Sequence, residues 1–346
     1  MKRRRSNLSE QILQRSRQPQ KENRKRPDFI STGSVALNLA LSQRGRDGGW
    51  ARGHIGNIVG DGSTGKTILS IETAAAFFHK LNPDPINFAP VKSLQIVYNN
   101  VEGVMDFPLE RMYGEEFVDG VEWIRTETVE AFGRDVHRRV LELKEGEALL
   151  YIADSIDAMV SEVGKKRAED EALGKKVSGG TYGVDKAKYF SSEFFNNLCN
   201  MTAGKDATIL MVSQVRENLN AGLFGKKFYR TGGKALNFYT HQVVWLYQID
   251  KLEQTFRKRK RVYGVKIRAK VERNKVAPPY REMDMPIIFD YGVDDVGAMA
   301  DYLGAQIDRE NISPNSPEYN GLAKKIEQEW AEEEAAVKSE RKGKYE

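Results

Sequence analysis

The stretch Gly60-Asp61-Gly62-Ser63-Thr64-Gly65-Lys66-Thr67 matches the phosphate-binding loop pattern G-x-x-x-x-G-K-[ST] at every constrained position. The run 54–59 before it can form a buried strand. Residues 68–78, beginning with Ile68, contain no helix breaker and are apolar at helical spacing. In such a unit the loop N–H groups and the helix N-terminus surround an anion. We therefore expect residues 60–68 to bind a nucleoside triphosphate, with Lys66 at the β- and γ-phosphates and Thr67 on Mg²⁺.

Length and composition limit the class of protein. The chain has 346 residues, 40% of them hydrophobic, which suits one large domain with small appendages. No apolar run approaches the roughly 18 residues of a membrane span, and the basic start is not followed by the apolar stretch of a secretory signal. Cys199 is the only cysteine, which suits a reducing cytoplasm. The net charge of +5 permits nucleic-acid binding without requiring it.

The chain divides into three expected regions. Residues 1–27 form a basic, polar N-terminal arm, and residues 305–346 form a short charged tail with a solvated helix expected over Ile326–Lys344. Between them, residues 28–304 alternate strand-like and helix-like segments. The apolar runs 94–98, 148–153, 208–212 and 243–247 are typical of strands covered on both faces, and residues 263–271 alternate like an antiparallel strand. The pattern predicts an α/β core with a mostly parallel sheet flanked by helices.

Polar residues follow three of these strands. Glu102 comes after the first run, Asp154 after the second and Gln214 after the third. Ligands of open α/β sheets collect at strand C-termini. Asp154 is therefore a candidate Mg²⁺ ligand, Glu102 a candidate to activate water, and Gln214 a candidate γ-phosphate sensor. Each such residue alone is more often a cap or turn residue, but their occurrence on a sheet with a phosphate loop favours function.

Two segments are basic and rich in glycine. The first lies between Gln214 and Tyr239, and the second runs from Lys165 to Gly180. Cationic side chains neutralise phosphates and apolar side chains contact bases, so DNA contact is the functional interpretation and a solvated loop is the alternative. The candidates are Arg216, Leu219, Lys226, Lys227, Arg230, Gly232, Gly233 and Lys234 in the first segment and Lys175 and Lys176 in the second.

Over residues 28–304 the chain resembles the RecA family of homologous-recombination ATPases of bacterial or phage type. The segments that carry the resemblance are Ile30-Ser31-Thr32-Gly33-Ser34, the phosphate loop, Thr231-Gly232-Gly233-Lys234-Ala235-Leu236-Asn237-Phe238-Tyr239, Lys270-Val271-Glu272-Arg273-Asn274-Lys275 and Tyr291-Gly292-Val293-Asp294. The resemblance implies a RecA-like ATPase core.

The resemblance also implies roles for single residues. Glu102 matches the water-activating glutamate, Asp154 the Mg²⁺-associated aspartate, and Gln214 the glutamine that links the γ-phosphate to the DNA-binding loop. Asp106 falls where the family contacts adenine, and Phe238 matches an interface aromatic. Arg273 and Lys275 match two lysines that reach a neighbouring subunit's γ-phosphate, with arginine replacing the first lysine. Arg216, Gly232, Gly233 and Lys234 match phosphate contacts, and Leu219 matches a base wedge.

The expected function is an ATP- and Mg²⁺-dependent recombinase that forms helical filaments on single-stranded DNA and pairs it with homologous duplex DNA. Hydrolysis of ATP at subunit interfaces would be DNA-dependent. The expected location is the cytoplasm of a bacterium or a phage-infected host, with single-strand-binding and loading proteins as partners. Residues 1–27 are expected in subunit association, and non-specific attraction of DNA by this basic arm is the alternative. A hexameric helicase-type motor and a non-hydrolysing ATP-binding scaffold are the alternatives.

Overall fold

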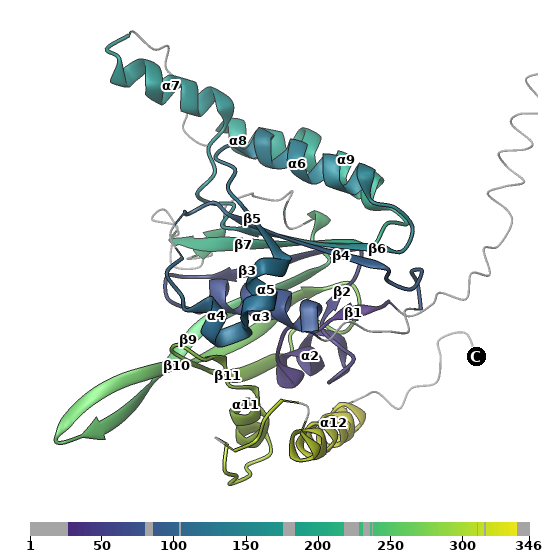
Figure 1. The fold of residues 1–346 in the computed structure, drawn as a ribbon, viewed down its shortest axis with the longest axis vertical. Helices are drawn as coiled ribbons and strands as arrows, with labels where there is room; N and C mark the ends of the chain where they lie inside the picture. Colours follow the sequence, from purple (N-terminus) through teal and green to yellow (C-terminus); the bar gives the residue numbers. More distant parts are fainter. Residues whose placement is uncertain are drawn as a thin grey trace, which may run out of the picture.

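The computed structural model describes residues 27–79, 86–103, 105–175, 184–217, 228–230, 236, 238–309, 311–314 and 316–337. Its strands are β1 (Phe29–Ile30), β2 (Trp50–Ala51), β3 (Ile55–Gly60), β4 (Ser93–Asn100), β5 (Val121–Ile124), β6 (Glu147–Asp154), β7 (Ala207–Glu217), β8 (Phe228–Arg230), β9 (Gln242–Phe256), β10 (Arg259–Asn274), β11 (Glu282–Ile288) and β12 (Gly292–Val293). The main sheet has the order β12-β11-β10-β9-β3-β7-β6-β4-β5, β8 is added to β7, and β1 pairs with β2 (Figure 1).

The sheet has a parallel part and an antiparallel part. Strands β9, β3, β7, β6, β4 and β5 are parallel to one another, and β10, β11 and β12 continue the sheet from β9 in antiparallel fashion. In the parallel part, successive side chains enter opposite faces. On β6, Leu150 and Ile152 join one core cluster and Leu149 and Tyr151 join the other. Both faces are therefore covered, as apolar strand runs predict.

Helices cover both faces of the sheet (Figure 1). One cluster of apolar residues includes side chains of α6 and α9, while the other includes side chains of α2, α3, α4, α5, α11 and α12. The short helix α7 has no buried residue and projects from the body. The helix bounds are α2 (Val35–Ser42), α3 (Lys66–His79), α4 (Leu109–Tyr113), α5 (Glu115–Gly120), α6 (Val129–Glu142), α7 (Glu162–Ala172), α8 (Val184–Tyr189), η1 (Phe190–Phe194), α9 (Phe195–Thr202), α11 (Asp295–Tyr302) and α12 (Pro317–Val337).

The predicted fold class is confirmed. The four apolar runs lie in β4, β6, β7 and β9, and residues 263–271 lie in β10, whose two neighbours are both antiparallel to it. The extent of β9 and β10 is larger than the sequence pattern indicated. Beyond the sheet they continue as an exposed two-stranded hairpin, which the burial pattern cannot specify because both of its faces are polar.

The C-terminal helix differs from the expectation. We expected a solvated helix over Ile326–Lys344, but α12 begins earlier, at Pro317, and is described to Val337. Its residues Tyr319, Leu322, Ala323, Ile326 and Trp330 are buried in the core cluster shared with α2 and α11. The high content of Glu and Lys on its other faces concealed this apolar stripe, whose members recur at helical spacing.

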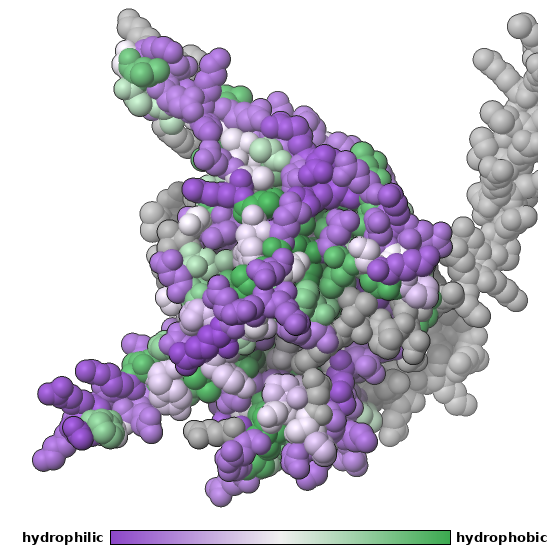
Figure 2. Space-filling model, in the orientation of Figure 1, coloured by the Kyte–Doolittle hydropathy of each residue, from purple (hydrophilic) through white to green (hydrophobic). Residues whose placement is uncertain are grey.

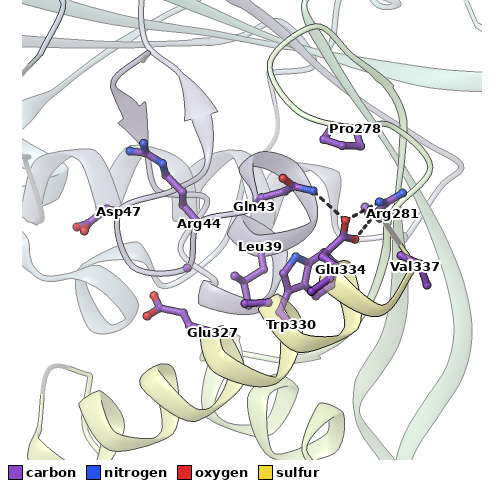
Figure 3. A pocket seen from close by; sticks show the side chains of 13 residues that line it. Leu39, Gln43, Arg44, Asp47, Pro278, Arg281, Glu327, Trp330, Glu334 and Val337 are labelled. Carbon is purple, nitrogen blue, oxygen red and sulfur yellow. Dashed lines mark hydrogen bonds and ion pairs between the residues drawn. The ribbon is translucent and has the colours of Figure 1, made fainter. Parts of the chain in front are cut away.

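A groove lies where α12 meets α2 and the segment after β10 (Figure 3). Glu334 points across it and accepts a hydrogen bond of 2.6 Å from Nη2 of Arg281 and one of 3.0 Å from Nε2 of Gln43. Trp330 lies beneath these groups, and its ring is 6.0 Å from that of Tyr302. The helix is thus held by apolar burial and by a bidentate ion pair, which is the stronger kind of charged contact.

We predict that Trp330→Ala destabilises the protein by about 3–5 kcal/mol, because a large buried side chain is lost and leaves a cavity. Trp330 is only 6% exposed, whereas Val337 on the same helix is 76% exposed. The matched control Val337→Ala should change the urea midpoint little. Equal losses from both substitutions would show that α12 does not pack on the core as described.

Candidate nucleotide and hydrolysis site

The phosphate loop leaves β3, which lies between β9 and β7 in the sheet. Gly60 ends the strand, and α3 begins at Lys66. Ser63 has φ of 60° and Gly65 has φ of 79°, so the chain curls back at these two positions. A Cβ at Gly65 would lie 2.2 Å from Cδ1 of Ile287, and the positive φ strains any other residue, so glycine is favoured there. The helix start behind this curl presents N–H groups without intrahelical partners, which suits an anion.

Lys66 is held inside this loop. Its side chain is buried, and Nζ donates a hydrogen bond of 2.6 Å to the backbone carbonyl oxygen of Asp61. Asp61 itself is exposed. Burial lowers the pKa of the Lys66 ammonium below its usual value, although nearby carboxylates, that of Asp154 first, favour the charged form. A partly desolvated cation at a helix N-terminus fits a phosphate, because the ligand supplies the negative charge that the site lacks.

Asp154 ends the neighbouring strand β6 and is buried. The hydroxyl of Tyr98 on β4 donates a hydrogen bond of 2.7 Å to its Oδ2, and Ser70 of α3 lies 2.8 Å from the same hydroxyl. Burial raises the pKa of the Asp154 carboxyl, while hydrogen bonds from Thr67 and Tyr98 oppose that rise. The peptide bond that follows, between Asp154 and Ser155, is cis.

The pair Thr67 and Asp154 fits Mg²⁺. Both provide oxygen atoms, and the hydrogen bond between them places the hydroxyl of the phosphate loop beside the carboxylate of the strand end. Mg²⁺ commonly takes one or two protein oxygens and completes its shell with phosphates and water. Within the described part of the chain, no group of three or more His, Cys, Asp or Glu side chains is arranged to hold a metal ion.

Glu102 and Gln214 come together as the strand order predicts. Nε2 of Gln214 donates a hydrogen bond of 2.9 Å to Oε1 of Glu102, and Oγ of Ser155 donates one of 2.7 Å to the same oxygen. The backbone N–H of Gln214 donates a hydrogen bond of 2.7 Å to Oδ2 of Asp157. The ends of β4, β6 and β7 are thus linked by side-chain contacts, because these strands are parallel neighbours.

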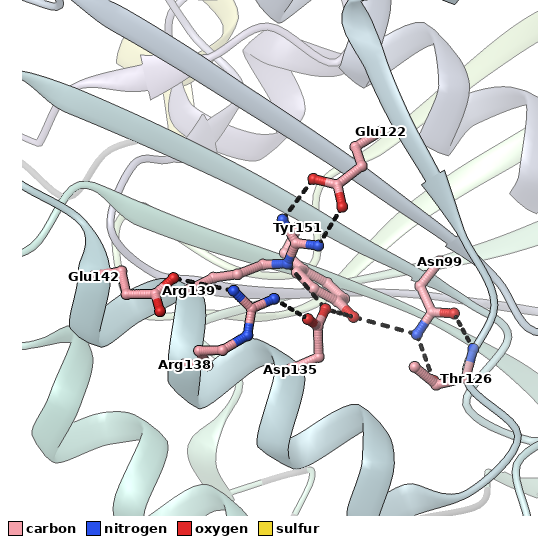
Figure 4. Close-up of polar contacts among 8 residues, drawn as sticks. All are labelled: Asn99, Glu122, Thr126, Asp135, Arg138, Arg139, Glu142 and Tyr151. Carbon is pink, nitrogen blue, oxygen red and sulfur yellow. Dashed lines mark hydrogen bonds and ion pairs between the residues drawn. The ribbon is translucent and has the colours of Figure 1, made fainter.

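A second polar network supports the strand ends from the α6 face (Figure 4). Arg139 donates two hydrogen bonds of 2.6 Å to Glu122 of β5, and its Nε donates one of 2.9 Å to Asp135. The hydroxyl of Tyr151 donates a hydrogen bond of 3.0 Å to Asp135, and Asn99 donates one of 3.3 Å to that hydroxyl. This chain of contacts joins α6 to β4, β5 and β6 and fixes the spacing of the strands that carry Glu102 and Asp154.

Arg273 and Lys275 lie at the other edge of the sheet. Asn274 pairs with Gln242, which pairs with Gly56 at the start of β3, whereas the phosphate loop follows Gly60 at its end. Nζ of Lys275 and Nη2 of Arg273 lie 3.1 Å and 3.5 Å from the carbonyl oxygen of Phe238. Desolvation, and then the charge of Arg273, lowers the pKa of Lys275. The structure therefore does not bring these two residues to the phosphate loop of their own subunit.

The residues predicted to contact DNA are described only in part. Arg216 and Arg230 lie on the antiparallel pair of β7 and β8, in which Val215 pairs with Arg230 and Arg216 with Tyr229. Lys175 is exposed after α7, and its Nζ forms an ion pair of 2.7 Å with Asp170. Leu219, Lys226, Lys227, Gly232, Gly233, Lys234 and Lys176 lie outside the described residues, so their roles stay predictions.

Two other predictions remain untested. Asp106 is exposed in the segment after β4, and its contact with adenine stays a prediction. The arm of residues 1–27 lies outside the described residues except for Pro27, so its part in subunit association also stays a prediction.

Some contacts of the site have no signal in the sequence pattern. Tyr98 lies in the apolar run 94–98, and its hydroxyl contact with Asp154 has no periodic signature. Ser155 follows Asp154 directly, and Asp157 comes two positions later, after the buried Ile156. A cluster of polar residues, rather than a single one, was the signal for their contacts with Glu102 and Gln214.

A phosphate loop after a central strand of a mostly parallel sheet, with acidic residues at neighbouring strand ends, defines a P-loop nucleoside triphosphatase core. A family model described as the RecA N-terminal domain matches residues 142–294. The protein RecA of Nitratiruptor sp. is 29% identical over 81% of this chain and 72% of its own length. Those of Sulfurimonas denitrificans and Helicobacter pylori are each 27% identical over 81% of this chain and 71% of their own length.

The chain is thus similar to the RecA family over most of its length. This similarity supports a recombinase that binds ATP and DNA, and the family generally uses Mg²⁺. No helix within the described residues is long and apolar enough to span a membrane.

We predict that Lys66→Ala abolishes ATP turnover and nucleotide-dependent DNA binding, because it removes the only cation described inside the loop. Steady-state ATP hydrolysis and equilibrium binding of a fluorescent ATP analogue are the measurements. Lys144→Ala, at an exposed position before β6, is the control. Hydrolysis by the Lys66→Ala protein at the parent rate would disprove the assignment of the site.

Proposed function

We propose that this protein is an ATP-dependent recombinase that polymerises on single-stranded DNA and promotes homologous pairing and strand exchange, with ATP hydrolysed between subunits. The observation that carries the proposal is the hydrogen bond of 2.9 Å between Gln214 and Glu102. It joins the candidate hydrolytic carboxylate to the strand from which the basic, glycine-rich segment departs. Filament formation, strand exchange and DNA-dependent hydrolysis are all part of this proposal.

The coupling follows from the path of β7. The strand continues beyond Gln214 to Glu217 and pairs with β8, which returns antiparallel to it. The sequence between and after these strands contains Lys226, Lys227 and Lys234. A change in the partners of Gln214 at the γ-phosphate would shift the strand that leads to these cations. DNA binding and the nucleotide state are then linked, and by thermodynamic necessity each changes the affinity for the other.

Each side chain of the site has one proposed action in ATP hydrolysis. Both described contacts of the Glu102 carboxylate are to Oε1, so we assign Oε2 to the water. As the water oxygen bonds to the γ-phosphorus, Glu102 takes its proton and the bond from that phosphorus to the bridging oxygen breaks, which leaves ADP and phosphate. Lys66 balances charge on the phosphates. Bound Mg²⁺, held by Thr67 and Asp154, would neutralise charge on the β- and γ-oxygens.

The position of Arg273 and Lys275 supports an interface site. Arg273 is level with Asn57, three residues of β3 before the loop begins at Gly60, which is on the order of 10 Å at 3.3 Å per residue. The side chain of Phe238 beside them is 67% exposed, and Nζ of Lys275 lies 5.9 Å from its ring centre. An exposed aromatic flanked by two cations is suited to contact another subunit, where the cations would meet that subunit's nucleotide.

Electron microscopy with single-stranded DNA and a slowly hydrolysed ATP analogue tests the proposal. Helical filaments support the recombinase, rings support the helicase-type motor, and monomers support the scaffold.

The Glu102→Gln protein should form filaments with ATP itself and dissociate from DNA more slowly, because it binds ATP but lacks the charge that activates water. Unchanged ATP turnover by this variant would remove Glu102 from the catalytic role.

We further predict that Arg273→Ala and Lys275→Ala proteins bind ATP yet hydrolyse almost none. Mixing either one with Glu102→Gln subunits should restore turnover, because some interfaces then have intact groups on both sides. In a random equal mixture about one quarter of the interfaces have both groups intact, so turnover should approach one quarter of the parent rate. Either variant alone should lack the roughly 10³–10⁵-fold acceleration that a trans-acting cation contributes.

The matched control for that mixing experiment is a mixture of Arg273→Ala with Lys275→Ala. Both defects then lie on the same side of every interface, so no interface is complete and no rescue is expected. If filaments shown to contain both Glu102→Gln and Arg273→Ala subunits remain inactive at every mixing ratio, the assignment in trans is wrong.

A further inference from the structure

The hairpin formed by β9 and β10 extends well beyond the rest of the sheet. Leu246 of β9 pairs with Gly60, at the level where the phosphate loop begins, and the strand then continues to Phe256. Those ten residues correspond to roughly 33 Å at 3.3 Å per residue. In Figure 1 the hairpin projects from the body at a position well separated from α7. Every residue from Glu253 to Tyr263 is exposed.

The end of this hairpin is strongly basic. The sequence Arg257-Lys258-Arg259-Lys260-Arg261 surrounds the turn. Lys260 forms an ion pair of 2.6 Å with Glu253. Within the described part of the chain, no carboxylate forms an ion pair with any of the other four cations. The space-filling view shows the projecting end as hydrophilic around one small hydrophobic spot (Figure 2).

The two faces of the hairpin differ. Phe256 pairs with Arg259 and Gln254 pairs with Arg261, so these four side chains share one face. The opposite face carries Glu253, Thr255, Lys260 and Val262, where the ion pair cancels the charge. One face therefore presents two arginines, an amide and an aromatic ring that is 69% exposed. These groups are suited to contact phosphates, base edges and sugars.

The turn residues add two more cations at the tip. Arg257 has φ of 48° and Lys258 has φ of 65°, and these values correspond to a two-residue turn with both central residues in the left-handed region. Asn-Gly is the favoured sequence for such a turn, and long side chains are disfavoured there. The guanidinium of Arg257 lies 5.1 Å from the centre of the Phe256 ring. The chain thus places cations where local backbone preference opposes them.

We propose that the tip of the β9–β10 hairpin is a binding site for double-stranded DNA, with Arg257, Lys258, Arg259 and Arg261 on phosphates. A two-stranded ribbon fits the major groove of B-form DNA, and cations at its tip and edges meet the phosphates on either side. The inference rests on the proposed function. In a filament each subunit would present one such tip to the duplex being tested, apart from the segments that hold the first strand.

Counterion release provides the measurement. For duplex DNA, the slope of log K against log salt changes by about 0.9 for each phosphate contact. Filaments are assembled on unlabelled single-stranded DNA with a slowly hydrolysed ATP analogue. A fluorescent duplex of unrelated sequence is then titrated at several salt concentrations and followed by anisotropy. Affinity for labelled single-stranded DNA is measured in parallel.

Two double variants each remove two of the four cations. Arg257→Asn with Lys258→Gly installs the favoured turn sequence, and Arg259→Gln with Arg261→Gln changes the arginine face only. Each should lower the magnitude of the duplex slope by about two and leave single-strand affinity within about twofold. The turn variant should also unfold at a higher temperature, so weaker duplex binding cannot then be due to misfolding.

Two control variants isolate the site. Glu253→Gln with Lys260→Gln alters the opposite face of the same hairpin without changing the net charge. Lys324→Gln with Lys325→Gln removes two exposed positive charges from α12. Both should retain the parent slope. An unchanged slope in the two tip variants, or an equal change in the α12 control, would overturn the proposal.

The remaining outcomes also test the proposal. If the tip variants lose single-strand affinity as much as duplex affinity, the tip serves the first strand and the proposal is wrong. If they lose neither, the tip serves something other than DNA, such as an acidic protein, and the proposal is again wrong. If the parent protein forms no filament, the proposed function fails. The same duplex titration on the free protein then tests the hairpin separately.

Discussion

The parallel pairing of β4, β6, β7 and β3 is the constraint on which the rest of the structure depends. Parallel neighbours end at the same edge, so a polar residue after each strand is placed beside the others without any local signal between them. The register from Ile55 with Ile209 to Gly60 with Gln214 places the start of the phosphate loop level with Gln214. One further pairing, of Asn100 with Asp154, sets Glu102 near Ser155. The site therefore depends on the sheet register.

The sequence predicted this arrangement because strand ends and the phosphate loop are local features. It did not predict Tyr98 on Asp154, because a tyrosine inside an apolar run has the same hydropathic pattern whether or not its hydroxyl has a partner. The packing of α12 was obscured for a related reason. Its glutamates dominate the composition, whereas its stability comes from a narrow stripe that includes Ile326 and Trp330. The positions of Arg273 and Lys275 could not be derived from spacing, since they follow from the antiparallel direction of β10.

The hydrogen bond between Gln214 and Glu102 can supply a free energy of the size needed to couple nucleotide binding to DNA binding. A hydrogen bond to a charged group contributes about 1.5–3 kcal/mol when buried, and less at an exposed residue such as Gln214. Allosteric coupling energies are typically 1–3 kcal/mol. Exchange of the Glu102 partner for a phosphate oxygen is thus of the right size to bias β7, whereas the buried network of Arg139, Asp135 and Tyr151 is suited to remain fixed. A conformational switch requires one contact that changes partner, here that of Glu102, while the surrounding strands keep their positions.

The distribution of charge matters more than the net value of +5. Glutamates are concentrated on α12, where Glu334 holds Arg281, and among the described residues four cations that form no ion pair lie together at the hairpin tip. A protein with these charges spread evenly would attract DNA to every surface. Because the basic groups are separated from the acidic ones, DNA is attracted to the projecting hairpin tip. Interactions between exposed charges are largely screened beyond about 8–10 Å at physiological salt. The hairpin extends several times that length past the phosphate loop, so contacts at its tip act on DNA with little direct electrostatic effect on Lys66 or Asp154.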